Sequence, residues 1–137
     1  MKKSHIFIVS LSLSLCSNLA LANSDRCAKI SGAWDGLAKI KTALGICEYT
    51  ARANFTNFTN GSGDAKLIFS KKTGNASCSV TLNDTAVITC NGEAAKLDSS
   101  ISNLKGTVMG DGLRMILSGI FKVHDKDYPA ELDIHKN

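Results

Sequence analysis

The alternation of apolar and polar side chains from Cys47 onward, within residues 46–56, is the feature that most limits the fold of this chain. Successive side chains of a β-strand point to opposite faces, so this segment is expected to be a strand with one buried face. The positions predicted to face inward are Cys47, Tyr49, Ala51, Ala53 and Phe55, and the outward positions between them are Glu48, Thr50, Arg52 and Asn54.

Shorter segments with the same period of two follow along the chain, separated by turn residues every eight to twelve positions. We expect a short helical turn within residues 23–31. The Asn-Gly pair at 91–92 and the Gly-Asp-Gly at 110–112 are strong turn signals, and a hairpin turn is also expected at Asn83-Asp84. The further predicted strands are residues 34–42, 65–71, 77–82, 85–91, 94–98, 102–109, 113–123 and 130–135.

This order of about eight or nine strands joined by short turns predicts an all-β, antiparallel up-and-down meander. A meander of this size tends to close into a barrel because closure removes the exposed strand edges. A β-sandwich is the alternative. No Pro-rich or low-complexity linker interrupts residues 23–137, so they are expected to form a single domain.

The N-terminus reads as a signal peptide. Lys2 and Lys3 precede an apolar stretch over residues 6–16, and Ala20-Leu21-Ala22 provides the small-x-small cleavage pattern. We therefore expect cleavage after Ala22 and export, in a bacterium, to the periplasm or the medium. No other segment is apolar and long enough to span a membrane, so the mature domain is expected to be soluble.

The mature chain keeps Cys27, Cys47, Cys78 and Cys90, which is typical of two disulfides in a small exported domain. Cys78 and Cys90 are equidistant from Asp84, the centre of the expected hairpin. This predicts the pairing Cys78–Cys90 with Cys27–Cys47. The pairing Cys27–Cys90 with Cys47–Cys78 stays open, because the N-terminal segment would have to fold back along the barrel to reach Cys47.

Gly32-Ala33-Trp34 opens the first predicted strand after the expected helical turn. A Gly-x-Trp in this place resembles the calycin barrels, namely the lipocalins and, more loosely, the avidin-like proteins. The resemblance implies a closed barrel in which Trp34 packs across the closed end. It does not extend to a ligand, because avidin-like sites use several Trp residues and this chain has one. The alternative is that Trp34 is an ordinary core aromatic.

No catalytic, cofactor or metal motif stands out, so we expect neither a metal nor a cofactor. His124 and His135 do not share a metal-ligand spacing, and His124 with nearby aspartates is better read as a solvated turn. Ser102 and Lys105 match Ser-x-x-Lys, but in a strand context without its partner motifs. The charges are scattered, and Lys71-Lys72 is the only adjacent basic pair of the mature chain, so nucleic-acid binding is not expected.

The inward aromatic residues Tyr49, Phe55 and Phe69, together with Trp34, are the candidate lining of a ligand cavity. The alternative is that they fill the core, as in most small barrels. The leading functional hypothesis is a non-enzymatic exported protein that binds a small apolar ligand. The second is an inhibitor or an envelope- or host-interaction protein that contacts a protein partner through loops, for which residues 57–63 and 83–84 are candidates at one barrel end. An exported enzyme is the least supported alternative.

Overall fold

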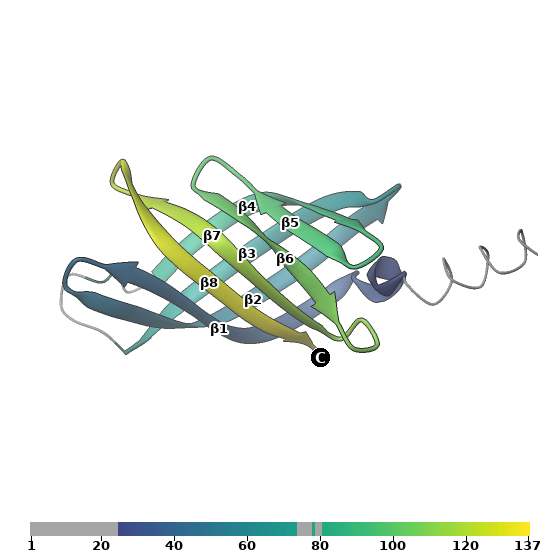
Figure 1. Cartoon of the computed structure of the whole chain (residues 1–137), viewed down its shortest axis with the longest axis horizontal. Coiled ribbons are helices and arrows are strands. Elements are labelled where there is room, and N and C mark those ends of the chain that lie inside the picture. The colour runs from purple at the N-terminus through teal and green to yellow at the C-terminus, as the bar shows by residue number, and fades with distance from the viewer. Residues whose placement is uncertain (1–24, 74–77, 79–80) are drawn as a thin grey trace, which may run out of the picture.

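The computed structural model describes residues 25–73, 78 and 81–137, so the predicted signal peptide lies outside the described residues. A short 3-10 helix precedes eight antiparallel strands (Figure 1). The elements are η1 (Arg26–Lys29), β1 (Gly32–Thr42), β2 (Gly45–Thr59), β3 (Ser62–Thr73), β4 (Thr81–Asn91), β5 (Ala94–Asp98), β6 (Ser102–Met109), β7 (Arg114–Val123) and β8 (Lys126–Lys136).

The strands form one closed up-and-down barrel. Each strand pairs with the next in the chain, and β8 pairs with β1 from Trp34↔Lys136 to Ile40↔Ala130. Every strand therefore has a hydrogen-bonded neighbour on both sides, which removes the open edges. The predicted closed barrel is confirmed, and the sandwich alternative is excluded.

The barrel has two different ends. The helix end, at the right of Figure 1, carries η1 and the turns at residues 60–61, 92–93 and 110–113. The opposite end carries the turns at residues 43–44, 99–101 and 124–125. Within the described part of the chain, no helix has the length and apolar character needed to cross a membrane.

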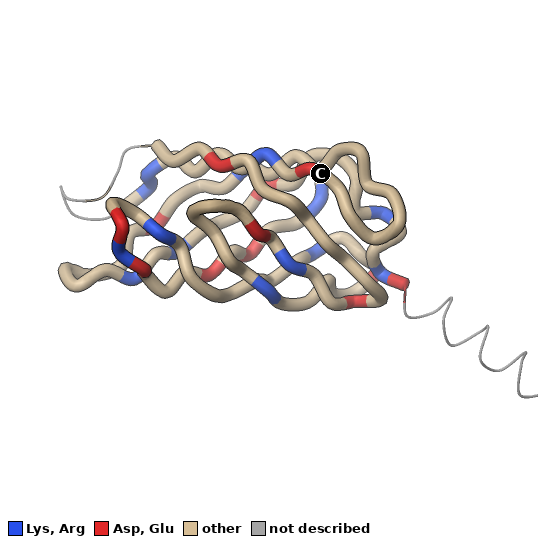
Figure 2. The backbone as a smooth tube through the Cα atoms, turned by 90° about the horizontal axis from the view of Figure 1, so that it is seen from above, with Lys and Arg blue, Asp and Glu red and all other residues tan. Residues whose placement is uncertain are grey.

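The barrel interior is a continuous apolar core. Inward positions alternate with outward ones along every strand, and among residues with a described burial Ser102 is the only buried polar side chain. Outward positions carry charges of both signs, which are interspersed along the tube in Figure 2. The fully buried large side chains are Trp34, Phe55, Phe69, Phe121, Ile30, Leu67, Ile88, Leu97, Leu104, Met115, Leu117 and Leu132.

The predicted hairpin turn at Asn83-Asp84 is wrong. Both residues lie inside β4, which pairs with β3 in unbroken register from Ser62↔Thr89 to Ser70↔Thr81. Part of the strand predicted over residues 77–82 lies outside the described residues. The turn preference of the Asn-Asp pair is overridden by the hydrogen bonds of the strand ladder and by partners for the Asp84 carboxylate.

Asp84 faces the barrel interior and anchors the turn between β5 and β6. Its Oδ2 accepts hydrogen bonds from the hydroxyls of Ser99 and Ser102, each at 2.8 Å. The Ser99 hydroxyl also accepts the backbone N–H groups of Ile101 and Ser102, at 3.1 and 2.9 Å. The half-buried carboxylate is thereby satisfied by a turn that is distant in sequence.

The predicted pairing of Cys78 with Cys90 and of Cys27 with Cys47 is also wrong. The disulfides are Cys27–Cys90 and Cys47–Cys78, with Cα–Cα distances of 5.8 and 6.0 Å. Because β4 is extended over about 30 Å from residue 81 to Cys90, Cys78, which precedes it, and Cys90 lie at opposite ends of the strand, beyond the reach of a disulfide. Cys90 lies at the helix end beside η1, whereas Cys78 lies at the opposite end beside the start of β2.

An ion pair on the outer face of β7 and β8 makes the free energy of unfolding depend on pH in the acid range. Arg114 donates two hydrogen bonds to Asp133, from Nε at 3.1 Å and Nη2 at 2.8 Å. These bonds hold the pKa of the Asp133 carboxyl below its ordinary value, against a smaller opposing effect of burial. A pKa lowered by folding contributes stability above the unfolded-state pKa, and this contribution is lost as the pH falls through the folded-state value.

We therefore expect Asp133→Asn to melt at a lower temperature than the parent protein at pH 7. The difference should shrink as the pH falls from about 4, the unfolded-state pKa of an aspartate, through the lowered folded-state pKa, below which the parent carboxylate is protonated as well. Thermal unfolding followed by circular dichroism from pH 7 to pH 2 checks this, with Asp111→Asn in the exposed β6–β7 turn as control. A difference that stays constant over the whole range would contradict it.

Candidate ligand pocket

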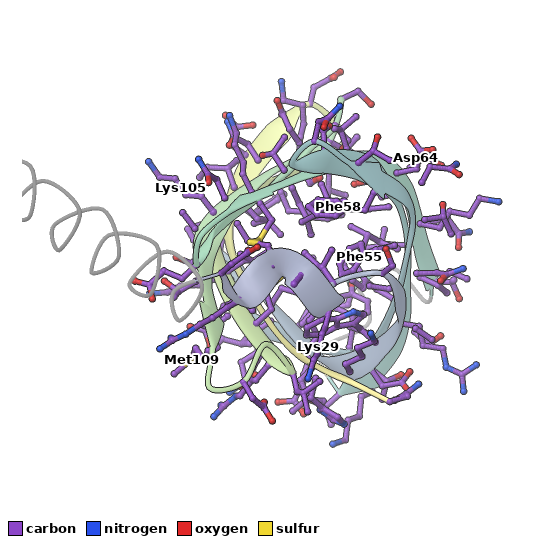
Figure 3. All side chains as sticks on the ribbon, turned by 90° about the vertical axis from the view of Figure 1, so that its right-hand side faces the viewer. Lys29, Phe55, Phe58, Asp64, Lys105 and Met109 are labelled. Carbon is purple, nitrogen blue, oxygen red and sulfur yellow. A yellow bond between two sulfur atoms is a disulfide. The ribbon has the colours of Figure 1, made fainter. Side chains whose placement is uncertain are left out.

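A pocket of about 1010 Å³ opens at the helix end of the barrel. One wall is η1 with the residue before it, and a second is the tip of the β2–β3 hairpin. The remaining walls are the end of β4, the β4–β5 turn and the adjoining parts of β5 and β6. Figure 3 looks onto this end, with η1 lying across the mouth of the ring of strands.

Small residues create the hollow. At these positions there is no side chain larger than a methyl group to fill the space between the walls. Gly106 is fixed as glycine by the barrel itself, because a Cβ there would collide with the carbonyl oxygen of Ile116 on β7. The small residues that line the pocket are Gly61, Gly92, Gly106, Ala28, Ala94 and Ala95.

A β-bulge in β2 places Phe58 in this pocket. In a regular strand Phe58 would point outward, three positions after the inward Phe55. The register between β2 and β3 shifts between Thr56 and Thr59, Asn57 has a positive φ of 55°, and its Nδ2 donates to Asp64 Oδ2 at 3.0 Å. Phe58 is thereby half-buried against the core, and Figure 3 shows it with Phe55 inside the ring.

The wall formed by η1 is held by covalent and backbone bonds. The Cys27–Cys90 disulfide joins η1 to β4, and the Arg26 N–H donates to the Gly92 carbonyl at 2.8 Å. The Cys90 N–H donates to the Gly61 carbonyl at 2.9 Å, which ties the β2–β3 tip to the same strand. The pocket is thus bounded by segments that cannot separate without breaking these bonds.

Two lysines stand at the rim of the pocket. Lys96 on β5 and Lys105 on β6 are exposed, line the pocket and are direct register partners. Lys96 Nζ lies 4.0 Å from Asp98 Oδ2 on its own strand. Lys105 has no ion pair among the residues that the structure describes.

The four aromatic residues predicted to contact a ligand all face the barrel core. Trp34 and Phe55 pack edge to face at 5.8 Å between ring centroids, and Tyr49 and Phe69 lie 6.4 Å apart. Each is at most 2% exposed, and Phe69 also packs on Phe121 at 5.6 Å. None of the four lines the helix-end pocket, so their role in binding stays a prediction.

The segment predicted as a contact loop is divided between strand, bulge and turn. Residues 57–63 contribute Phe58, Asn60 and Gly61 to the pocket, whereas Asn83 and Asp84 lie on β4 away from it. The two candidate loops therefore do not meet at one barrel end. Sequence reasoning missed Phe58 and Lys96 as individual pocket residues and considered Lys105 only in a Ser-x-x-Lys match, although residues 57–63 around Phe58 were a candidate contact loop.

The other chemical candidates are separated by the fold. Ser102 is buried inside the barrel, while Lys105 lies on the outer face, because residues three apart in a strand point to opposite sides. His124 and Asp125 occupy the β7–β8 turn with positive φ values. Among the described residues, no three His, Cys, Asp or Glu side chains are grouped so that they could hold a metal ion.

No known protein-family model matches this sequence, and no curated protein or solved structure is significantly similar to it. The chain is a closed eight-stranded antiparallel barrel, cross-linked by two disulfides, with a pocket beside its N-terminal 3-10 helix.

Proposed function

We propose that this protein is a non-enzymatic binding protein that holds a small ligand in the helix-end pocket. The observation that carries the proposal is the pocket itself, whose volume of about 1010 Å³ is at the upper end of the range usual for small-molecule sites. Phe58, the disulfide and the alanine methyl groups offer an apolar surface, while asparagine and lysine side chains surround it. This mixture suits a ligand with an apolar body.

Preorganisation supports the same function. The disulfide, the two backbone hydrogen bonds and the bulge that places Phe58 are intramolecular and fix the walls without a ligand. A site that is already ordered loses little conformational entropy on binding. The pocket therefore has the character of a built site.

The proposal also includes the structural class of the barrel and the cellular location of the protein. Trp34 donates its Nε1–H to the Ile30 carbonyl at 2.8 Å, which docks the end of η1 onto the barrel. A buried Trp two residues after Gly32 that holds the preceding helical turn supports a calycin-like barrel, as the Gly-x-Trp resemblance implies. Two disulfides and the predicted signal peptide support a periplasmic or secreted protein.

The neutral fluorescent probe N-phenyl-1-naphthylamine tests the binding function. We expect the mature protein to bind it with enhanced emission, and Ala28→Phe to weaken binding at least about tenfold because the ring fills the pocket. Ala28 is exposed on η1, so the larger side chain does not overpack the core.

The matched control is Ala43→Phe in the exposed β1–β2 turn at the opposite end, which should bind the probe like the parent protein. If the probe does not bind, or if both variants bind it equally well, the proposed site is wrong.

A second candidate function is contact with a protein partner. Leu44 and Ile46 at the tip of the β1–β2 hairpin are 73% and 57% exposed, the highest values among the large hydrophobic side chains that the structure describes. A photo-crosslinking amino acid at position 44 should then capture one specific protein in the native host, and the same group at position 122 should not. An identical capture pattern from both positions would reject this candidate.

A further inference from the structure

Lys96 and Lys105 place two like charges directly opposite each other on neighbouring strands. Such a cross-strand pair is destabilising unless a carboxylate or another anion lies nearby. Figure 3 shows Lys105 on the outer side of the barrel wall, whereas Phe58 lies inside the ring of strands. Both lysines are long and exposed, so their ammonium groups can reach the mouth of the pocket.

The carboxylates near this pair leave its charge largely uncompensated. Asp98 lies 4.0 Å from Lys96, at the limit of an ion pair. Glu93 is engaged by Arg26 at 3.3 Å on the η1 side. Asp25 is the one carboxylate among the lining residues, and it precedes η1 on another wall without an ion pair to either lysine among the described contacts.

We propose that the pocket takes an amphipathic anion: an apolar body against Phe58 and the alanines, with a carboxylate or sulfonate at the lysine rim. This inference rests on the proposed function and names the ligand class for the same site. An anion between the two ammonium groups relieves their repulsion and gains charge-assisted hydrogen bonds. A neutral molecule of the same shape gains only the apolar contacts.

Two probes with the same ring system separate these contributions. 1-Anilinonaphthalene-8-sulfonate carries a sulfonate, and N-phenyl-1-naphthylamine lacks it. We expect the anionic probe to bind about tenfold more tightly than the neutral one at low salt. In Lys96→Gln/Lys105→Gln the ratio should fall to about one, because the anionic probe loses its charged partners and the neutral probe has none to lose. About 0.5 M NaCl should reduce the ratio in the parent protein in the same way.

Lys122→Gln, which removes an exposed lysine of β7 far from the pocket, is the matched control and should keep the parent ratio. Suppose that the neutral probe binds the parent protein and binds Ala28→Phe more weakly, but the ratio of affinities is unchanged in the double lysine variant. The proposed ligand class is then wrong, while the proposed binding function stands. If Ala28→Phe binds the neutral probe with the affinity of the parent protein, the proposed function itself is wrong.

Discussion

Replacing Cys27 and Cys90 together by serine is expected to lower the free energy of unfolding by about 4 kcal/mol and to abolish binding of the neutral probe. The disulfide closes a loop between residues 63 apart in sequence, so its removal restores much conformational entropy to the unfolded chain. It also cross-links η1 to β4, and η1 is a wall of the pocket. Urea unfolding followed by circular dichroism measures the first effect, and probe titration measures the second.

The second disulfide provides the control. Cys47→Ser/Cys78→Ser opens a loop between residues 31 apart at the opposite end, with an expected cost of about 3.5 kcal/mol. The helix-end pocket is untouched, so this variant should still bind the probe under conditions in which it is folded. Loss of binding in this variant with binding retained in the other would contradict the assignment of the site.

Trp34→Ala is expected to cost about 4 kcal/mol of stability. The side chain is fully buried, packs edge to face on Phe55 at 5.8 Å and donates to the Ile30 carbonyl at 2.8 Å. Its removal leaves a cavity beneath η1 and an unpaired carbonyl group. Unfolding must be followed by far-ultraviolet circular dichroism, since the variant has lost the only tryptophan of the chain.

Trp34→Phe separates packing from hydrogen bonding. It keeps an aromatic ring but has no N–H donor, so we expect a smaller cost of about 2 kcal/mol. Equal losses for the two variants would mean that the hydrogen bond to Ile30, rather than packing on Phe55, dominates the contribution of Trp34. A loss below about 1 kcal/mol for Trp34→Ala would contradict the account, because neither the packing on Phe55 nor the hydrogen bond to Ile30 would then contribute much to stability.

Much of the barrel could be predicted from local patterns. Residues 94–98 and 102–109 form the strands β5 and β6 with the predicted bounds, and the inward face of β2 is the one predicted. A period of two is readable because a one-residue shift would expose the whole apolar face. The turn at Asn91-Gly92 was equally readable, since its glycine adopts the positive φ of 66° that this residue favours.

The central error began at Asn83-Asp84. Two turn-forming residues lie within a strand because the Asp84 carboxylate is satisfied by Ser99 and Ser102, which no local rule connects to it. The false hairpin then placed Cys78 beside Cys90 and carried the disulfide prediction with it. The pairing left open was the correct one, since an unbroken β4 puts these cysteines at opposite ends of the barrel.

The pocket could not be predicted either, because its residues are brought together by contacts between distant segments. Phe58 lines it only through a bulge that needs Gly63 on β3, where a Cβ would lie 2.9 Å from the Cα of Phe58 and from the Thr56 carbonyl oxygen. Lys96 and Lys105 face each other only through the register between β5 and β6. Both facts depend on pairing between strands, and the sequence of one strand does not contain them.

The most direct test of the account is an NMR titration of the ¹⁵N-labelled mature protein with N-phenyl-1-naphthylamine. We predict that the largest amide shifts cluster at the helix end, on Phe58, Gly61, Gly92 and Gly106, which line the pocket. The turns at residues 43–44, 99–101 and 124–125 should stay unchanged. Shifts confined to those turns, or the absence of any saturable shift, would contradict a ligand site beside η1.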